Sequence, residues 1–244
     1  MQTDADPLTV VLAGGLGTRI RHLLGGLPKP LAPAAGRPFV EWVLRFLRAQ
    51  GISRVVLSVG YLGDRIEEVS KALCVPGLAI RCVREPAPLG TAGALTYALT
   101  QLPEEIGDLL VCNGDSLALA QLDGLRSAFK DPAVDAAILG VWVADAGRYG
   151  TLVCGADGAL TGFAEKRPGV GLVNAGVYLL RRSVISRFPD HVPLSLECDV
   201  FPLLLRQGVR VLVVPCDCPF LDIGTESTLT QADPFVLANM RWFE

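Results

Sequence analysis

The chain has 244 residues, half of them hydrophobic and 19% charged, with a formal net charge of −3 at pH 7. This composition excludes an intrinsically disordered chain. The negative balance argues against a nucleic-acid partner bound by phosphate neutralisation, so any cationic site must be local.

Three further features concern where the protein works. No apolar run approaches the roughly 20 residues that cross a bilayer, and the N-terminal sequence MQTDADPLTV has neither the basic nor the apolar stretch of a signal peptide. Seven cysteines are scattered without a C-x-x-C pair, which favours buried, reduced thiols over a zinc or redox site. We therefore expect a cytoplasmic protein with no membrane partner.

The first half of the chain alternates between predicted strands and helices. Residues 8–13 are a continuous apolar run that ends in glycines, and Pro38 begins a helix with apolar residues at helical spacing that ends at Gly51. Further elements of this half are expected at 54–59, 64–73, 78–83, 91–102 and 108–112. The β-α-β-α-β order predicts a mostly parallel sheet with helices on both faces.

The pattern changes after about residue 133. Short predicted strands follow one another through short turns, which favours antiparallel additions to the sheet. These strands are expected at 136–143, 151–154, 160–164 and 176–180, followed by a helix at 200–207, a strand at 209–214 and a final helix from Thr225. No linker or charge block divides the chain, so we expect a single α/β domain over residues 1–244 with halves at about 8–132 and 133–244.

Residues 10–30, VVLAGGLGTRIRHLLGGLPKP, combine a strand with a glycine-rich, cationic loop. Glycines at 14, 15 and 17 can bring backbone N–H groups against an anion. Arg19 offers a planar fork for phosphate oxygens, and Lys29 is a compact charge between two prolines. The combination predicts a polyphosphate site, whereas glycines alone would indicate an ordinary turn with solvated charges.

Two other phosphate-binding motifs fail at this loop. A dinucleotide fingerprint requires a third glycine where Ile20 stands, and a P-loop requires a G-K-[ST] sequence that is missing. A second polar turn, 113–115, also follows a predicted strand. Ligands of open α/β sheets bind outside the carboxyl ends of the strands, so we expect this turn and the glycine loop to share one cleft.

The string G-G-x-G-T-R at 14–19, with P-K-P at 28–30, resembles the signature of the sugar-1-phosphate nucleotidylyltransferases. The resemblance covers nearly the whole chain. It continues in EPAPLGTAGAL at 85–95, Asn-Gly-Asp at 113–115, Tyr-Gly at 149–150, Glu-Lys at 165–166, Asn-Ala-Gly at 174–176 and Asp-Ile-Gly-Thr at 222–225. It implies a Rossmann-like fold with a nucleotide-binding and a sugar-phosphate-binding half, and an enzyme that joins a nucleoside triphosphate to a sugar 1-phosphate and releases pyrophosphate.

The resemblance also implies roles for individual residues. Arg19, Lys29 and Asp115 would be catalytic, and Asp115 and Asp222 would hold Mg²⁺, which prefers oxygen ligands. The nucleotide would contact Leu12, Ala13, Gly14, Gly15, Gly17, Thr18, Glu85, Pro88, Gly90, Thr91 and Asn113; the sugar phosphate would contact Gly150, Glu165, Lys166 and Asn174. Without the resemblance, Asp222 before Gly-Thr would indicate a helix N-cap, and the Glu-Lys pair an exposed ion pair of little energetic value.

Glu85 suggests which base is bound. A carboxylate accepts two hydrogen bonds side by side, and guanine presents two adjacent donors, whereas uracil and thymine present one donor between acceptors. We therefore predict GTP as the nucleotide. The alternative is that Glu85 is a surface residue beside Arg84 and that backbone groups read the base.

The sugar is indicated by resemblance alone. The stretch GGLGTRIRHLLGGLPKPLAP is most similar to D-glycero-D-manno-heptose 1-phosphate guanylyltransferases, which supply GDP-heptose for bacterial surface glycans. A chain that ends at Glu244 suits that group, because many mannose-1-phosphate guanylyltransferases continue into a further domain. The alternatives are a mannose-1-phosphate guanylyltransferase, a uridylyl- or thymidylyltransferase, and a non-catalytic nucleotide-sugar-binding subunit. The sequence does not determine the oligomeric state, and a homodimer is one possibility.

Overall fold

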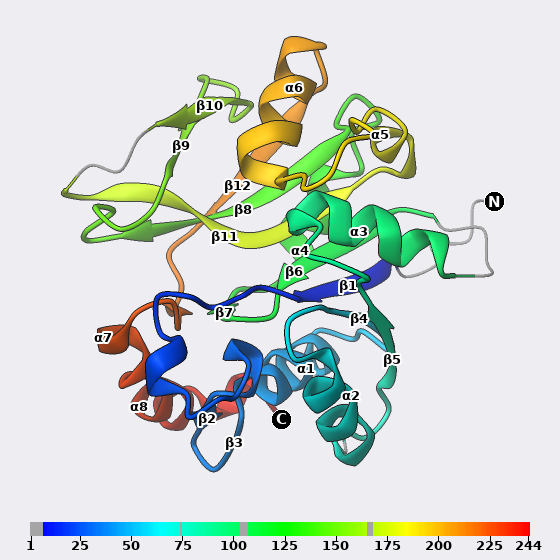
Figure 1. Ribbon diagram of the computed structural model, residues 1–244. Coiled ribbons are helices and arrows are strands. Elements are labelled where there is room, and N and C mark those ends of the chain that lie inside the picture. The colour runs from blue at the N-terminus through cyan, green and yellow to red at the C-terminus, as the bar shows by residue number, and fades with distance from the viewer. Residues whose placement is uncertain (1–6, 74, 103–106, 165–167) are drawn as a thin grey trace.

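The computed structural model describes residues 7–73, 75–102, 107–164 and 168–244. A mixed sheet runs through its centre and helices cover both faces (Figure 1). The nine strands assigned to this sheet among the described residues are β1 (Leu8–Ala13), β4 (Arg54–Val59), β5 (Ala79–Arg84), β6 (Leu109–Asn113), β8 (Ala136–Val143), β9 (Thr151–Cys154), β10 (Leu160–Ala164), β11 (Gly171–Leu180) and β12 (Val211–Cys216). The predicted mostly parallel α/β sheet with antiparallel additions is confirmed.

The sheet joins the two predicted halves of the chain without a break. Strands β6, β1, β4 and β5 are neighbours and parallel. Strand β11 lies antiparallel to β6 on one side and to β8 on the other, and β12 then pairs with β8 in parallel. The boundary expected near residue 132 therefore falls within one hydrogen-bonded sheet.

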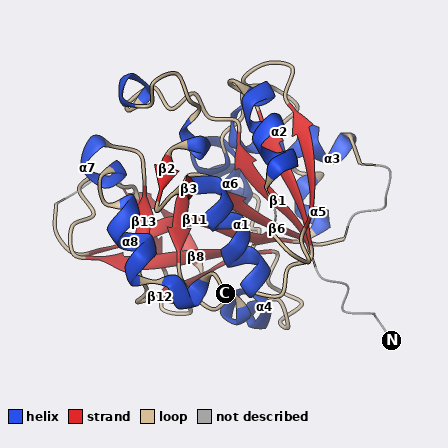
Figure 2. Ribbon diagram, turned by 90° about the horizontal axis from the view of Figure 1, so that it is seen from below, coloured by secondary structure: helices blue, strands red, loops and turns tan. Residues whose placement is uncertain are grey.

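The helices form two layers (Figures 1 and 2). Helices α1 (Phe39–Ala49), α2 (Gly63–Ala72), α4 (Asp123–Ala128) and α8 (Ala232–Ala238) contribute buried residues to one core cluster, and α3 (Gly90–Thr100), α5 (Arg182–Ile185) and α6 (Phe201–Arg206) to the other. Val11 and Val10 of β1 point into opposite clusters, as alternation along a strand that is buried on both faces requires. None of the described helices is long and apolar enough to span a bilayer.

Several short elements are not apparent from the sequence pattern. They are the paired strands β2 (Pro33–Ala34) and β3 (Arg37–Pro38), the paired strands β7 (Ser116–Ala118) and β13 (Phe220–Asp222), helix α4, and the short turns η1 (Arg21–Leu23), η2 (Lys29–Leu31), η3 (Leu196–Val200) and η4 (Met240–Trp242). The single final helix predicted from Thr225 is divided into two helices, α7 (Glu226–Leu229) and α8. Strand β11 begins five residues before the predicted 176, because Gly176, at φ +72°, continues the strand through an irregularity.

The described cysteines are all free thiols, as predicted, but the expectation that they are mostly buried is wrong, because only Cys112 among them is buried and Cys154 and Cys198 are exposed. Cys74 lies outside the described residues. Burial raises the pKa of Cys112 to about 12, which keeps its thiol protonated and unreactive.

Gly90 opens α3 in a conformation that other residues rarely adopt, with φ +76°, and a Cβ there would lie 2.5 Å from the Leu194 carbonyl oxygen. We predict that Gly90→Ala lowers the free energy of unfolding by about 3 kcal/mol or more, through backbone strain and overlap. The matched control is Gly36→Ala. Gly36 has φ +77° but open space around its Cβ, so only the conformational cost of about 1 kcal/mol applies. Urea denaturation of both variants measures the difference, and equal losses would contradict the close contact with Leu194.

Candidate active site

The glycine loop and the Asn-Gly-Asp turn meet because β1 and β6 are neighbouring parallel strands. Leu12 pairs with Asn113, and the Gly114 N–H donates to the Leu12 carbonyl at 2.8 Å. A Cβ on Gly114 would lie 2.9 Å from that same carbonyl oxygen, so the close approach requires glycine. The predicted common cleft therefore forms at the carboxyl ends of these strands.

A pocket opens at this place, and residues from the glycine loop form most of its wall. Its lining consists of Leu12, Ala13, Gly15, Gly17, Thr18, Arg19, Ile20, Lys29, Pro30, Asp115 and Gly224. Gly17 turns the loop with φ +57°, and a Cβ there would press against Lys29 at 3.1 Å. Eight of the residues predicted for catalysis or nucleotide binding thus line one cavity, with backbone N–H groups and two cations available to a polyanion.

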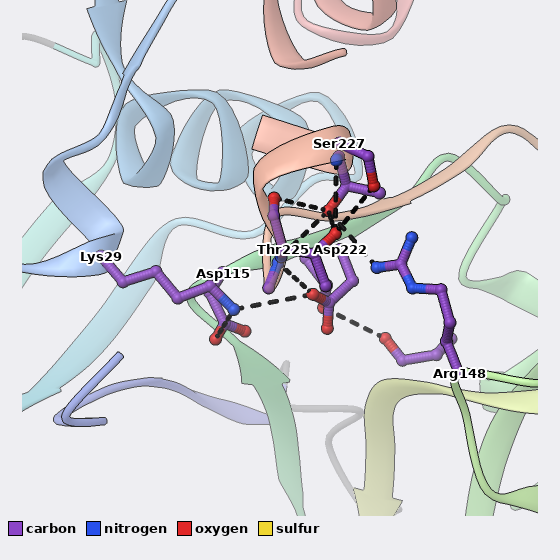
Figure 3. Close-up of polar contacts among 10 residues, drawn as sticks. Lys29, Asp115, Arg148, Asp222, Thr225 and Ser227 are labelled. Carbon is purple, nitrogen blue, oxygen red and sulfur yellow. Dashed lines mark hydrogen bonds and ion pairs between the residues drawn. The ribbon is translucent and has the colours of Figure 1, made fainter. Parts of the chain in front are cut away.

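Lys29 is the central charge of the pocket (Figure 3). It begins the turn η2 directly after Pro28, and only 8% of the residue is exposed. Its Nζ lies 2.8 Å from Asp115 Oδ2 and 3.6 Å from Asp222 Oδ1. Burial of an ammonium group costs several kcal/mol unless it is paired, and two half-buried carboxylates provide that pairing.

Asp222 reaches Asp115 through the small β7–β13 pair. Asp222 is in register with Ser116, and the Ile223 N–H donates to the Asp115 carbonyl at 3.1 Å. The Gly224 N–H donates to Asp222 Oδ1, and a Cβ on Gly224 would lie 3.4 Å from Arg19 Nη2. Helix α7 is capped by Thr225 through a capping box with Thr228, so Asp222 is not its N-cap.

The two carboxylates could hold a divalent cation. Lys29 brings one positive charge to the two negative charges of these carboxylates. The described residues contain no group of three or more His, Cys, Asp or Glu side chains arranged to hold a metal ion. A cation here would have to complete its coordination with water and phosphate oxygens, which is how Mg²⁺ commonly binds.

Tyr149 and its neighbours flank the pocket. The ring of Tyr149 packs on Phe220 at 5.7 Å between centroids. Burial raises the pKa of Tyr149, the charge of Asp222 raises it further, and Arg148 and Arg19 lower it, which shows that these charges lie around one phenol group. Gly150, predicted to contact the sugar phosphate, follows directly in the chain and is exposed.

Glu85 lies behind the glycine loop rather than in the lining of this pocket. Its side chain is almost fully buried, its Oε2 accepts from the Leu89 N–H at 3.2 Å, and a Cβ on Gly14 would overlap its Oε1. Burial raises the pKa of this carboxyl, and the hydrogen bond from Leu89 only partly opposes that effect. Glu85 is therefore not the surface residue that the alternative interpretation assumed.

A second polar cluster lies between β11 and η3. Asn174 Nδ2 donates to the Tyr178 hydroxyl at 2.8 Å, and that hydroxyl donates to Glu197 Oε1 at 2.7 Å. Asn174 is thereby placed in a network, whereas the predicted Glu165 and Lys166 lie outside the described residues.

Three further residues were predicted to contact the nucleotide. Pro88 and Gly90 are exposed, and Asn113 packs against Gly176.

Sequence patterns did not identify Tyr178 or Glu197. Tyr178 lies in an apolar strand and has the pattern of a core residue, and Glu197 precedes a helix, where acidic residues are ordinary. The only local signal is the acidic pair Glu197 and Asp199 beside apolar neighbours.

Comparison with known proteins decides the family. Residues 8–239 match the family described as nucleotidyl transferase. The chain belongs to the nucleotidyl transferase family. HddC from Yersinia pseudotuberculosis, crystallised in complex with GMP-PN, superposes on this nucleotidyl transferase with a TM-score of 0.81 and 30% identity over 92% of this chain and 96% of that chain. A putative glucose-1-phosphate thymidylyltransferase from Bacillus anthracis shares the fold with a TM-score of 0.75 at 20% identity, over 93% of this chain and 94% of that chain.

Two curated relatives differ in how much of their own length this nucleotidyl transferase covers. The mannose-1-phosphate guanylyltransferase of Mycobacterium tuberculosis is 35% identical over 209 residues, which are 85% of this chain and 56% of that protein. The D-glycero-alpha-D-manno-heptose 1-phosphate guanylyltransferase of Campylobacter jejuni is 33% identical over 216 residues, which are 88% of this chain and 93% of that protein. The chain thus spans a little over half of the first relative and nearly all of the second.

The buried Glu85 predicts a pH effect on stability. Its folded-state pKa is raised above the ordinary value of 4.5, so between that pH and the folded-state pKa the folded protein holds a proton that the unfolded chain has released. Stability must then fall as pH rises from 4.5 through the folded pKa. We predict that Glu85→Gln, which keeps an oxygen acceptor for Leu89, is more stable than the wild type at neutral pH and that the difference disappears at pH values below the ordinary pKa. Denaturant unfolding across this pH range measures it, and a less stable variant at neutral pH would contradict the buried position.

Proposed function

We propose that this chain is a sugar-1-phosphate guanylyltransferase. It transfers GMP from GTP to a sugar 1-phosphate, with D-glycero-D-manno-heptose 1-phosphate as the favoured acceptor, and releases pyrophosphate. The observation that carries the proposal is the meeting of Arg19, Lys29, Asp115 and Asp222 around one glycine-lined pocket. The guanylyltransferase relatives support the choice of nucleotide, and the heptose 1-phosphate guanylyltransferases among them support the choice of acceptor.

In the proposed reaction, a phosphate oxygen of the sugar 1-phosphate attacks the α-phosphorus of GTP. A new phosphorus–oxygen bond forms and the bond to pyrophosphate breaks in line, so no covalent enzyme intermediate is needed. The protein then acts by positioning the two phosphates and neutralising charge. Arg19, Thr18 and the loop N–H groups stabilise the departing pyrophosphate, and Lys29 bridges the triphosphate and the incoming phosphate.

Asp115 and Asp222 would hold Mg²⁺ in this reaction. The ion supplies positive charge to the phosphates, which lowers the repulsion between two anionic substrates. In the structure, Lys29 Nζ lies between the two carboxylates and holds them near each other. This lysine therefore prepares the carboxylates that are expected to bind the metal ion.

Glu85 is the proposed reader of guanine. An ionised carboxylate has more lone pairs than the Leu89 N–H uses, so it can also accept from the two adjacent donors of guanine. Gly14 and Gly60 pack close to this carboxylate, where a Cβ on Gly14 would overlap its Oε1 and a Cβ on Gly60 would lie 3.3 Å from it. The proposed recognition requires the ionised form of Glu85. Burial raises the pKa of this carboxyl, so more of it is protonated at acidic pH, and we expect GTP use to weaken there.

A mannose-1-phosphate guanylyltransferase is the second candidate, because the relative from Mycobacterium tuberculosis is as similar to this chain as the heptose enzymes are. A uridylyl- or thymidylyltransferase and a non-catalytic nucleotide-sugar-binding subunit are the remaining alternatives. A pyrophosphate-release assay that crosses GTP, ATP, CTP, UTP and dTTP with a panel of sugar 1-phosphates separates them. Heptose 1-phosphate with GTP is expected to give the highest kcat/KM, and no turnover with any pair would favour the binding subunit.

Lys29 and Asp115 are expected to be essential for turnover but not for folding. We predict that Lys29→Ala and Asp115→Asn each lower kcat by about a thousandfold, because such charge stabilisation contributes several kcal/mol to the transition state. The matched control is Asp123→Asn, since the exposed Asp123 forms an ion pair with Arg126 at 3.1 Å, away from the pocket lining. Circular dichroism checks the fold, and kcat within about threefold of the wild type would remove that residue from the mechanism.

The base preference provides an independent test of Glu85. We predict that Glu85→Gln lowers kcat/KM for GTP by roughly tenfold to a hundredfold relative to UTP and dTTP, because an amide offers one acceptor oxygen in place of two. Competition assays at equal nucleotide concentration measure the ratio. An unchanged ratio would assign base recognition to backbone groups.

A further inference from the structure

The segment 88–91 lies between two buried or half-buried carboxylates from different parts of the chain. On one side, the Leu89 N–H donates to Glu85 Oε2 at 3.2 Å. On the other side, the Thr91 hydroxyl lies 3.3 Å from Glu197 Oε2. The segment that was predicted to contact only the nucleotide therefore also contacts the acceptor half.

Backbone atoms make several of the bonds between this segment and the acceptor half. The Leu194 N–H donates to the Leu89 carbonyl at 2.8 Å, and the Leu194 carbonyl accepts from the Ala92 and Gly93 N–H groups at 2.9 and 3.2 Å. These bonds satisfy two of the N–H groups that the first turn of a helix leaves without partners. The first turn of α3 is thus capped by the chain that leads into η3.

Thr91 makes side-chain contacts at this junction. Its Oγ1 accepts from the Leu196 N–H at 2.8 Å and donates to Glu197 Oε2. Glu197 also accepts from Ser195 Oγ at 3.0 Å and from the Tyr178 hydroxyl at 2.7 Å. One hydroxyl therefore fixes both the backbone of η3 at its start and the orientation of the carboxylate that follows.

The network continues from Glu197 to the residue predicted to contact the sugar. The Tyr178 hydroxyl, on a fully buried residue, joins Glu197 to Asn174. These donors to the carboxylate are neutral, so hydrogen bonds rather than an ion pair hold the charge of Glu197 within this cluster. A carboxylate and an amide held in this way offer acceptors and donors that suit the hydroxyl groups of a sugar.

We propose that Thr91 is a positioning residue for the sugar 1-phosphate and acts through Glu197, rather than a residue that contacts the nucleotide. The inference rests on the proposed transferase function. It assigns the first turn of α3 to acceptor binding, although this turn belongs to the nucleotide half of the chain. Loss of the Thr91 hydroxyl leaves the Leu196 N–H without its acceptor and removes one of the hydroxyl donors to Glu197.

The experiment compares three variants of the full chain. Thr91→Val removes the hydroxyl and keeps the volume, and Thr91→Ser restores the hydroxyl. The matched control is Thr96→Val on the same helix, because the Thr96 hydroxyl donates within α3, to the Ala92 and Gly93 carbonyls. KM for GTP and for the sugar 1-phosphate are measured separately, and amide hydrogen exchange is followed in the peptide that covers 194–200.

Thr91→Val is expected to raise KM for the sugar 1-phosphate about tenfold, the usual effect of one buried unsatisfied group, and to leave KM for GTP within about twofold. It should also speed exchange in the 194–200 peptide, and Thr91→Ser should recover most of both effects, while Thr96→Val changes neither. A rise confined to KM for GTP, or no change in either KM, would overturn the inference. A wild-type protein with no turnover would instead reject the proposed function, and unchanged exchange in Thr91→Val would still refute the positioning role.

Discussion

The contact on which the site depends is the sharing of one buried ammonium group by two aspartates. Lys29 comes from the glycine-loop side of the pocket, and its partner Asp115 lies 86 residues later. Asp222 is later still and arrives on β13. A lone ammonium group buried to this extent would be unstable, and two carboxylates this close would repel each other. Each of the three charges is tolerated because the others are present.

The surrounding fold serves to bring these three charges together. Strands β1 and β6 are neighbours, so the glycine loop and the Asn-Gly-Asp turn leave the sheet side by side. The β7–β13 pair then joins the chain near Asp115 to the chain near Asp222. These connections are short, and the two core clusters on either side of the sheet supply the stability that they require.

Backbone bonds at several places join the chain before residue 132 to the chain after it. Strand β11 extends the sheet from β6, and Leu194 caps the first turn of α3. Such bonds leave little freedom for the halves to separate as rigid bodies. They also hold Thr91 of α3 against the start of η3. The burial of the Glu85 carboxylate lowers the free energy of unfolding, and destabilising residues of this kind are common at binding sites.

Local sequence was sufficient for the elements whose signal lies within a few residues. The apolar runs of β1 and β4 begin and end as predicted, because a strand buried on both faces appears as an unbroken hydrophobic stretch. The glycine loop with Arg19 and Lys29 was also predictable, since a cationic loop after a buried strand has few structural uses.

Contacts between distant segments became visible only when the chain was folded. They place Asp222 beside Lys29, and they extend the polar network from Asn174 through Tyr178 to Glu197. Short strands such as β7 and β13 pair because the surrounding sheet and core already hold their ends together. The sequence near each of these residues is compatible with an ordinary local role, such as a helix cap for Asp222 or a core position for Tyr178. The local sequence pattern therefore cannot predict which distant residue each of these side chains contacts, because the packing of the whole domain brings the two residues together.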